Sequence, residues 1–281
     1  MIDRRPEGRA VHCGTPVESE DLVLRWDDPA AQWGLGVFET IAVRDTEPRH
    51  LDEHLRRLGA AARQFSVPLP PVDEMVRAVR LVAEDVSNGT GWLKIVVSRS
   101  GQWVVFAGRI DPATEGKAVA AVVLPWRRHR LDPTAGIKSV GYAACMLGLE
   151  EAVRRGADEG FWLNERGHVF GACTGNVFVA RGRAVVTPSL PDGARDGVTR
   201  WRALVALREF GLSVRQSKVR FATLRAADEI FLTSSLRGVR AVVRIDGRKV
   251  RGGDPGPITR RLAEHLMASE ARHVTIKTRE A

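Results

Sequence analysis

The chain has few cysteines, and they show none of the spacings in which cysteine usually acts. Its three cysteines, Cys13, Cys145 and Cys173, are odd in number and form no CxxC or Cys/His pattern. Such spacing argues against a disulfide framework and against a zinc site. The sequence therefore predicts a protein of a reducing compartment, the cytoplasm, without a metal site.

Long apolar segments are also missing from the sequence. No run of about 18 apolar residues occurs. The opening stretch MIDRRPEGRAVHCG (1–14) contains no apolar segment of the kind found in signal peptides. Internal repeats and low-complexity tracts are missing as well. We therefore expect a protein that neither spans a membrane nor is exported by a signal peptide.

Positive charge is in excess but is spread along the chain. There are 43 Lys and Arg against 34 Asp and Glu, a formal net charge of +9. The one basic cluster is PWRRHRLDP (125–133), and a single cluster of this kind is typical of a solvated interdomain loop rather than of a nucleic-acid reader. We expect no nucleic-acid partner, and the charge suits small anionic molecules.

The first part of the chain alternates between strand and helix patterns. GVFETIAVRD (36–45) is typical of a strand, 51–65 and 72–86 of amphipathic helices, and 92–100, 103–110 and 118–125 of apolar strands. The following LPWRRHRLDPTAG carries prolines and charges without periodicity. We predict a small N-terminal α+β domain at 1–124, a linker at 125–136 and a larger, β-rich C-terminal domain at 137–281.

The second part combines helices with short strands. Helical spacing extends over 142–156 and 198–211, each closed by a glycine, and over 256–274. Between the first two helices, the strands 160–163, 168–171, 176–180 and 184–188 predict a compact β meander. A strand at 229–234 and a hairpin at 239–250 follow. These patterns predict a mixed α/β protein with antiparallel strands in its second half.

Several separate motifs occur in one order along the chain. They are WGLGVFETIAV (33–43), HLRRL (54–58), IKSVGYAACMLGLEEAVRRGADEGFWLNERGHV (137–169), GNVFV (175–179), VVTP (185–188), GVTR (197–200) and ADEIFLTSSLRGVRAVVRIDG (227–247). This series resembles the class IV aminotransferase family, which includes branched-chain and D-amino acid aminotransferases and 4-amino-4-deoxychorismate lyase. The resemblance implies fold-type IV, with two mixed α/β domains and the active site between them, and the cofactor pyridoxal 5'-phosphate.

The resemblance gives Lys138 the role of the lysine that forms a Schiff base with the cofactor aldehyde. A lysine must lose its proton to attack a carbonyl, and partial burial beside apolar residues lowers its pKa. Once displaced by the substrate amine, it can move the α-proton. Tyr142 matches a tyrosine found in some members, and packing of this ring in the core is the equal alternative.

The phosphate of the cofactor needs backbone amides and a cation. GVTR runs directly into a predicted helix, so the amides of Val198 and Thr199 point toward an anion. The resemblance adds the hydroxyls of Thr199, Ser234 and Ser235, together with Arg57 as the cation, while its neighbour Arg56 points elsewhere. A helix cap at Thr199 and a solvated helix face at Arg57 are the alternatives. For a substrate, Phe38, Arg99 and Arg237 are weaker candidates.

Gly171 departs from the family pattern. The resemblance implies a glutamate at this position, where a carboxylate keeps the pyridine nitrogen of the cofactor protonated. Strand alternation predicts that Val169, Gly171 and Cys173 share one face, which makes the weakly hydrogen-bonding Cys173 the nearest substitute. Water in the space left by the glycine is another possibility.

The sequence therefore predicts an enzyme that acts on a carboxylate-bearing amine, either by elimination of the aminodeoxychorismate-lyase type or by transamination of an amino acid. The alternative is a divergent member in which the glycine goes with a repurposed reaction, without the cofactor or without turnover. The expected partners are a small amino acid or amino-carboxylate substrate and, as the resemblance implies, a second copy of the chain.

Overall fold

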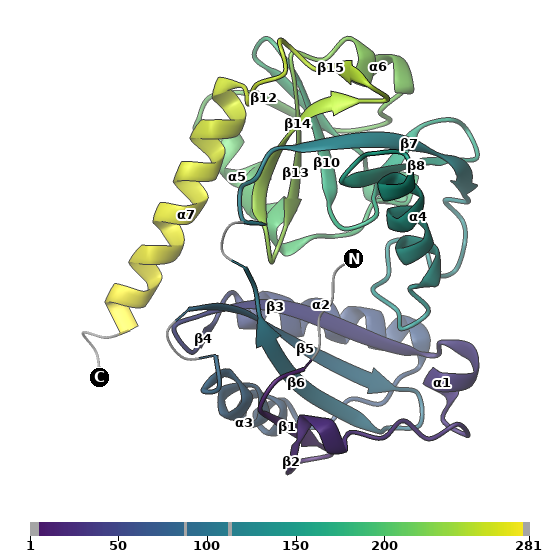
Figure 1. Cartoon of the computed structure of the whole chain (residues 1–281), viewed down its shortest axis with the longest axis vertical. Helices are drawn as coiled ribbons and strands as arrows, with labels where there is room; N and C mark the ends of the chain where they lie inside the picture. Colours follow the sequence, from purple (N-terminus) through teal and green to yellow (C-terminus); the bar gives the residue numbers. More distant parts are fainter. Residues whose placement is uncertain (1–5, 87–88, 112–113, 278–281) are drawn as a thin grey trace. The chain divides into compact units, whose positions relative to one another are not determined.

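A computed structural model describes residues 6–86, 89–111 and 114–277, with side chains as far as residue 270 (Figure 1). Residues 1–5 of the opening stretch lie outside the described residues. The chain forms two compact units, which are described separately: unit 1 comprises residues 1–112 and 137–142, and unit 2 comprises 113–136 and 143–281. The units differ from the predicted domains, because the predicted linker belongs to unit 2 and the short segment around Lys138 belongs to unit 1.

Unit 1 is built on an antiparallel sheet. In the part of the chain that the structure describes it has six strands in the order β2-β1-β6-β5-β3-β4. Their bounds are β1 Arg9–His12, β2 Thr15–Glu18, β3 Gly36–Arg44, β4 Glu47–Pro48, β5 Thr90–Ser98 and β6 Trp103–Arg109. The long central pair, β3 and β5, has full register from Gly36 opposite Ser98 to Arg44 opposite Thr90. The predicted strands are thereby confirmed.

Two helices form one apolar core with this sheet. Helix α2 (Leu51–Phe65) has the predicted bounds, and α3 (Val72–Ala83) ends three residues before the predicted end. Alternate residues of β3, among them Val37 and Ile41, are in the same core cluster as Leu58 of α2 and Val79 of α3. The short η1 (Ser19–Asp21) and α1 (Pro29–Trp33) precede β3.

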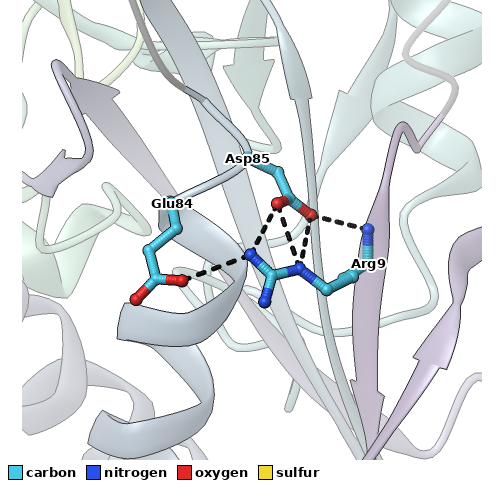
Figure 2. Close-up of polar contacts among 3 residues, drawn as sticks. All are labelled: Arg9, Glu84 and Asp85. Carbon is cyan, nitrogen blue, oxygen red and sulfur yellow. Dashed lines mark hydrogen bonds and ion pairs between the residues drawn. The ribbon is translucent and has the colours of Figure 1, made fainter.

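An ion pair attaches the first strand of unit 1 to the end of α3. Figure 2 shows the Arg9 guanidinium bound to Asp85, with Nη2 2.7 Å from Oδ1, while the backbone N–H of Arg9 donates to Oδ2 at 2.7 Å. Glu84 accepts a further hydrogen bond from Nη2 at 3.2 Å. Because the Arg9 side chain is 38% exposed, solvent screening limits this pair to about 0.2–1 kcal/mol.

Unit 2 is built on a mixed sheet with the order β12-β11-β10-β13-β14-β7-β8-β9 and with β15 paired to β14, among the described residues. Strand β7 is parallel to β8 and β14, and β11 is parallel to β12. The bounds are β7 Val119–Arg128, β8 Glu159–Asn164, β9 Val169–Ala172, β10 Asn176–Arg181, β11 Ala184–Thr187, β12 Ser213–Gln216, β13 Glu229–Ser234, β14 Gly238–Ile245 and β15 Arg248–Lys249.

The predicted meander is wrong, whereas the antiparallel strands expected in the second half are present beside the parallel pairs of β7 and of β11 with β12. Strands β8 and β9 form one hairpin and β10 and β11 another, but β10 pairs with β13 rather than with β9. A strand pattern does not reveal its partner, and here three strands from distant parts of the sequence lie between the two hairpins. The β14–β15 hairpin is confirmed, with Asp246 and Gly247 both at positive φ in its turn.

The helices of unit 2 are α4 (Ala143–Arg154), α5 (Val198–Glu209), α6 (Phe221–Arg225) and α7 (Pro257–Lys277), with η3 at Leu190–Asp192. Helices α5 and α7 share a core with Phe178 and Phe231, whose rings stack 5.0 Å apart. Figure 1 shows α7 as the long helix at the end of the chain. None of the described helices has the length and apolarity needed to cross a membrane.

Unit 2 also contains a buried ion pair. Arg240 of β14 donates from Nη2 to Oε2 of Glu159 at 3.3 Å, and both side chains are almost inaccessible to solvent. The hydroxyl of Thr174, in the turn between β9 and β10, donates to the same carboxylate. Glu159 therefore connects β8, β14 and the turn that follows β9.

Candidate active site

Lys138 lies in a short segment that runs alongside the start of β3. The backbone N–H of Phe38 donates to the Lys138 carbonyl at 2.9 Å, and Val140 N–H donates to the Gly36 carbonyl at 2.9 Å. These bonds hold the segment antiparallel to β3, with Ser139 bridged to Val37. The lysine therefore lies on a regular hydrogen-bonded frame, although the sequence around it has no strand pattern.

Two aromatic rings lie next to the Lys138 ammonium. Its Nζ is 4.1 Å from the centroid of the Phe38 ring and 5.5 Å from that of Tyr142. The two rings meet edge to face, with centroids 5.3 Å apart. A ring face attracts a cation and excludes part of its water. The predicted apolar neighbourhood of Lys138 is thus an aromatic one, and Tyr142 immediately precedes α4.

Sequence reasoning missed a second ammonium at this ring. Nζ of Lys94, on β5, is 4.6 Å from the Phe38 centroid. Lys94 is directly opposite Thr40, two residues from Phe38 on the same face of β3. Its signal in the sequence is a single charge inside the apolar run WLKIVV (92–97), half-buried among buried neighbours. The structure therefore brings two cations to one aromatic side chain.

Glu39, the residue after Phe38 on β3, forms a charged cluster with Arg57 and His54 of α2. Arg57 donates from Nε to Oε1 of Glu39 at 2.7 Å and from Nη2 to Oε2 at 2.6 Å. The ring of His54 lies with Nδ1 2.8 Å from Oε2. Burial opposes ionisation of Glu39, but the charge and hydrogen bonds of Arg57 outweigh it and hold the pKa of Glu39 well below its usual range.

Burial lowers the pKa of His54, and the charges of Arg57 and Lys138 lower it further, against the opposing effects of the hydrogen bond to Glu39 and of the Glu39 charge. The lowered pKa favours the neutral imidazole, and the tautomer that carries its proton on Nδ1 donates to Glu39. The solvated helix face considered for Arg57 is excluded, because this side chain is 17% exposed and bound to Glu39. Its neighbour Arg56 is exposed.

The start of α5 in unit 2 is open to an anion. Gly197 occupies the N-cap position, and no side chain caps the helix, which has no acidic residue in its first turn. The amides of Val198 and Thr199 therefore lack a side-chain acceptor at the positive end of the helix. Val198 is buried and Thr199 is half-buried.

Asn176 lies next to both the start of α5 and the end of β13. It pairs across the sheet with Thr233, the residue before Ser234, and its side-chain oxygen leaves no room for a Cβ on Gly197. Ser234 and Ser235 are both half-buried at the turn between β13 and β14. The expected phosphate-binding residues other than Arg57 thus lie in one part of unit 2.

The remaining arginine candidates differ in position. Arg99 is exposed just after β5, with its backbone N–H bonded to the Leu35 carbonyl at 3.0 Å. Arg237 is half-buried in the β13–β14 turn of unit 2. The two arginines therefore belong to different units.

Gly171 lies on β9 opposite Trp162 of β8. A Cβ placed on this glycine would meet a single atom within 4 Å, the Gly175 carbonyl oxygen at 3.8 Å, and its φ is not in the left-handed region. Neither the backbone conformation nor close packing therefore requires glycine here. The position has room for a side chain that the chain does not supply.

The predicted alternation around Gly171 is wrong. A bulge between Trp162 and Leu163 leaves one extra residue of β9, Phe170, between their partners Gly171 and Val169. Val169, opposite Leu163, therefore packs in the core, whereas Gly171 follows Trp162 to the other face. Cys173 is fully buried, and burial raises the pKa of its thiol. Its sulfur occupies the space next to Gly148 and Gly160.

No group of three or more His, Cys, Asp or Glu in the described ranges is arranged to hold a metal ion.

The candidate residues form two sets, one in each unit. Unit 1 brings together Lys138, Tyr142, Phe38 and Lys94, with Arg57 on the adjacent cluster. Unit 2 holds Gly171, Val198, Thr199, Ser234, Ser235 and Arg237.

The profile of the family described as Amino-transferase class IV matches residues 36–245. A putative branched-chain-amino-acid aminotransferase of Methanocaldococcus jannaschii is 27% identical over 89% of this chain and 92% of its own. The aminodeoxychorismate lyase of Bacillus subtilis is 28% identical over 83% and 85%. A fold IV-transaminase from Curtobacterium pusillum is 27% identical and superimposes with a TM-score of 0.82 over 92% and 93% of the two chains.

The chain belongs to the class IV aminotransferase family, and its fold is fold-type IV, as the motif series predicted. This is a family of enzymes that depend on pyridoxal 5'-phosphate. The relatives include both aminotransferases and a lyase, so family membership leaves the reaction and the substrate open.

Proposed function

We propose that this chain binds pyridoxal phosphate through Lys138 and acts on a carboxylate-bearing amine. The observation that carries the proposal is the position of the Lys138 Nζ, 4.1 Å from the Phe38 ring on a segment hydrogen-bonded to β3. This frame fixes the lysine backbone, and the aromatic wall limits its exposure to water. Both features suit a lysine that must attack a carbonyl.

The residues of both units fit most of the cofactor. When bound, the cofactor supplies an aldehyde for the lysine and a ring that withdraws electrons from the substrate Cα. Lys138 would hold it and move the α-proton, and Tyr142 would orient it. The uncapped amides of Val198 and Thr199, with the hydroxyls of Thr199, Ser234 and Ser235, would bind the phosphate.

Arg57 would add its charge to the phosphate site while remaining bound to Glu39. Because Glu39 balances the charge of Arg57, the guanidinium would orient the phosphate through hydrogen bonds more than it would attract it by net charge. The proposed cofactor-binding residues come from both units. The space beside Gly171 is the part that does not fit, because it lacks the carboxylate expected at the pyridine nitrogen.

The reaction is either an elimination of the lyase type or a transamination. The carboxylate of the substrate would be bound by a cation, for which Lys94 at the Phe38 ring is a candidate besides Arg99 and Arg237. The glycine at position 171 favours one alternative function. In that alternative, the chain is a divergent member with a repurposed reaction or a purely binding role.

Absorbance of the purified protein with pyridoxal phosphate, before and after borohydride reduction and with peptide mapping, tests the proposal. We expect a band near the visible edge and a reduced adduct on Lys138. Lys138→Ala should lose both, whereas Lys94→Ala, which removes the other ammonium at the same ring, should keep the adduct. An adduct on Lys94, or none on the wild type, would contradict the proposal.

A second experiment separates the two reactions. A lyase releases its keto acid in many turnovers without an amino acceptor, whereas a transaminase stops after one equivalent until a keto acid is added. Aminodeoxychorismate and branched-chain amino acids, each tested with and without 2-oxoglutarate, cover the two classes. The absence of turnover with a formed Lys138 adduct would favour the divergent alternative.

We also propose that the chain acts as a cytoplasmic homodimer. An exposed apolar stretch of unit 1 supports an interface, since Trp26 is 86% exposed and Val23, Leu24 and Trp33 are exposed beside it in sequence. Light scattering should give twice the chain mass, and Trp26→Glu should shift the protein toward monomer. A monomeric wild type at micromolar concentration would contradict this.

A further inference from the structure

A guanidinium in unit 2 lies over two buried aromatic rings. Arg128, at the end of β7, has Cζ 5.2 Å from the centroid of Phe170 and 5.8 Å from that of Trp162. Its Nη1 is 3.7 Å from the Cys145 sulfur. The rings hold the side chain in place on a half-buried surface.

These rings are the neighbours of Gly171. Trp162 is its partner across the β8–β9 ladder, and Phe170 precedes it in β9. Residues directly opposite in a ladder point to the same face. The Arg128 guanidinium therefore lies on the face of the sheet toward which a side chain at position 171 would project, and that space is open.

Arg128 has no carboxylate partner within 4.0 Å in the part of the chain that the structure describes. Nearby arginines do have one: Arg130 binds Glu165 and Arg155 binds Asp246. Hydrogen bonds from Thr134 lower the pKa of Asp132, and the charge of Arg128 contributes less to this lowering than they do. A cation held in place is thus left beside an unfilled space.

We propose that Arg128 and the space beside Gly171 bind a carboxylate group that comes from outside the chain. A carboxylate matches the planar guanidinium in charge and geometry. It would stand where the family places the carboxylate of a glutamate side chain. The position of this site next to the cofactor ring rests on the proposed function, but the binding of a carboxylate to unit 2 does not.

The binding is measured first on the full chain without cofactor. Acetate and formate are titrated by calorimetry against chloride at constant ionic strength. We expect saturable binding of the carboxylates, weakened about tenfold or more by Arg128→Met. Arg127→Met, which removes the adjacent exposed arginine, should leave the affinity unchanged. Gly171→Glu should abolish binding, because the new carboxylate occupies the space and pairs with Arg128.

Arg128→Lys keeps the positive charge but loses the planar guanidinium that can bind a carboxylate through two hydrogen bonds, so an intermediate affinity is expected. It also provides a result if Arg128→Met does not fold. Two sources of the carboxylate are distinguishable in the enzyme with cofactor. If the group belongs to the substrate, acetate competes with dicarboxylic amines and not with monocarboxylic ones. If the carboxylate belongs to a separate small acid, acetate changes the cofactor spectrum at a constant amine concentration. It then activates the enzyme and does not compete with the amine.

Carboxylate binding that is equal to chloride binding, or unchanged in both Arg128→Met and Gly171→Glu, would overturn the proposal. Failure of the proposed function has a different signature, since it is the loss of the Lys138 adduct in wild-type protein. The calorimetric result on cofactor-free protein does not depend on that adduct.

Discussion

The guanidinium of Arg57 holds both carboxylate oxygens of Glu39, at 2.7 Å from Nε and 2.6 Å from Nη2. Removal of the cation leaves a buried carboxylate without its counter-charge. We expect Arg57→Met to destabilise the protein by about 3 kcal/mol or more. Urea unfolding measures the loss, and Arg56→Met, at an exposed position of the same helix, should stay within about 0.5 kcal/mol of wild type.

A small loss with Arg57→Met would mean that Glu39 takes up a proton instead. In that case Glu39→Gln should be nearly neutral in the Arg57→Met background, because it removes a charge that is already absent. The same pair of variants can be assayed for cofactor affinity. A fall in affinity with Arg57→Met at unchanged folding supports its role toward phosphate.

The lowered pKa values of Glu39 and His54 predict that stability falls in acid. The pKa of His54 is lowered from an ordinary 6.5 and that of Glu39 from 4.5. The unfolded chain therefore binds more protons than the folded chain as the pH falls below these values. Each proton contributes a slope of at most about 1.4 kcal/mol per pH unit.

Urea unfolding between pH 8 and pH 5 checks the histidine part of this effect. The difference between wild type and His54→Gln isolates His54 from the other histidines. We expect the wild type to lose more stability than the variant as the pH falls through the region of the unfolded-state pKa. Parallel curves would show that His54 binds protons equally in both states.

The buried pair of Glu159 and Arg240 predicts a strongly non-additive double-mutant cycle. Glu159→Gln or Arg240→Met alone leaves one buried charge and should cost about 3–5 kcal/mol. The double variant should cost less than the sum of the two. Additive losses in urea unfolding would show that the charges do not interact.

Glycine is predicted to be dispensable for folding at position 171 and required at position 193. Gly171 has open space and an ordinary φ, so Gly171→Ala should change stability by no more than about 0.5 kcal/mol. Gly193 has φ at +99°, and a Cβ there would collide with the Phe170 ring. Thermal unfolding should show a clear loss for Gly193→Ala; a loss of similar size for Gly171→Ala would contradict the open space.

Local sequence patterns predicted much of the fold. The amphipathic spacing of 51–65 gives α2 with the predicted bounds, and Gly156 and Gly211 follow the ends of α4 and α5 at positive φ. These features depend on residues a few positions apart, so a short window contains their cause. Strand partners depend on distant residues, which is why the pairing of β10 with β13 was not predicted.

The sequence by itself determined the family, the candidate lysine and the absence of a glutamate at position 171, because these depend on residue identities and their order. Only the tertiary structure decided which charges meet. Lys94 reaches the ring of Phe38 through strand register, Arg57 reaches Glu39 through helix packing, and Arg128 reaches the neighbours of Gly171 across two strands. Such contacts join residues far apart in the chain, and packing rather than local preference sets their distance.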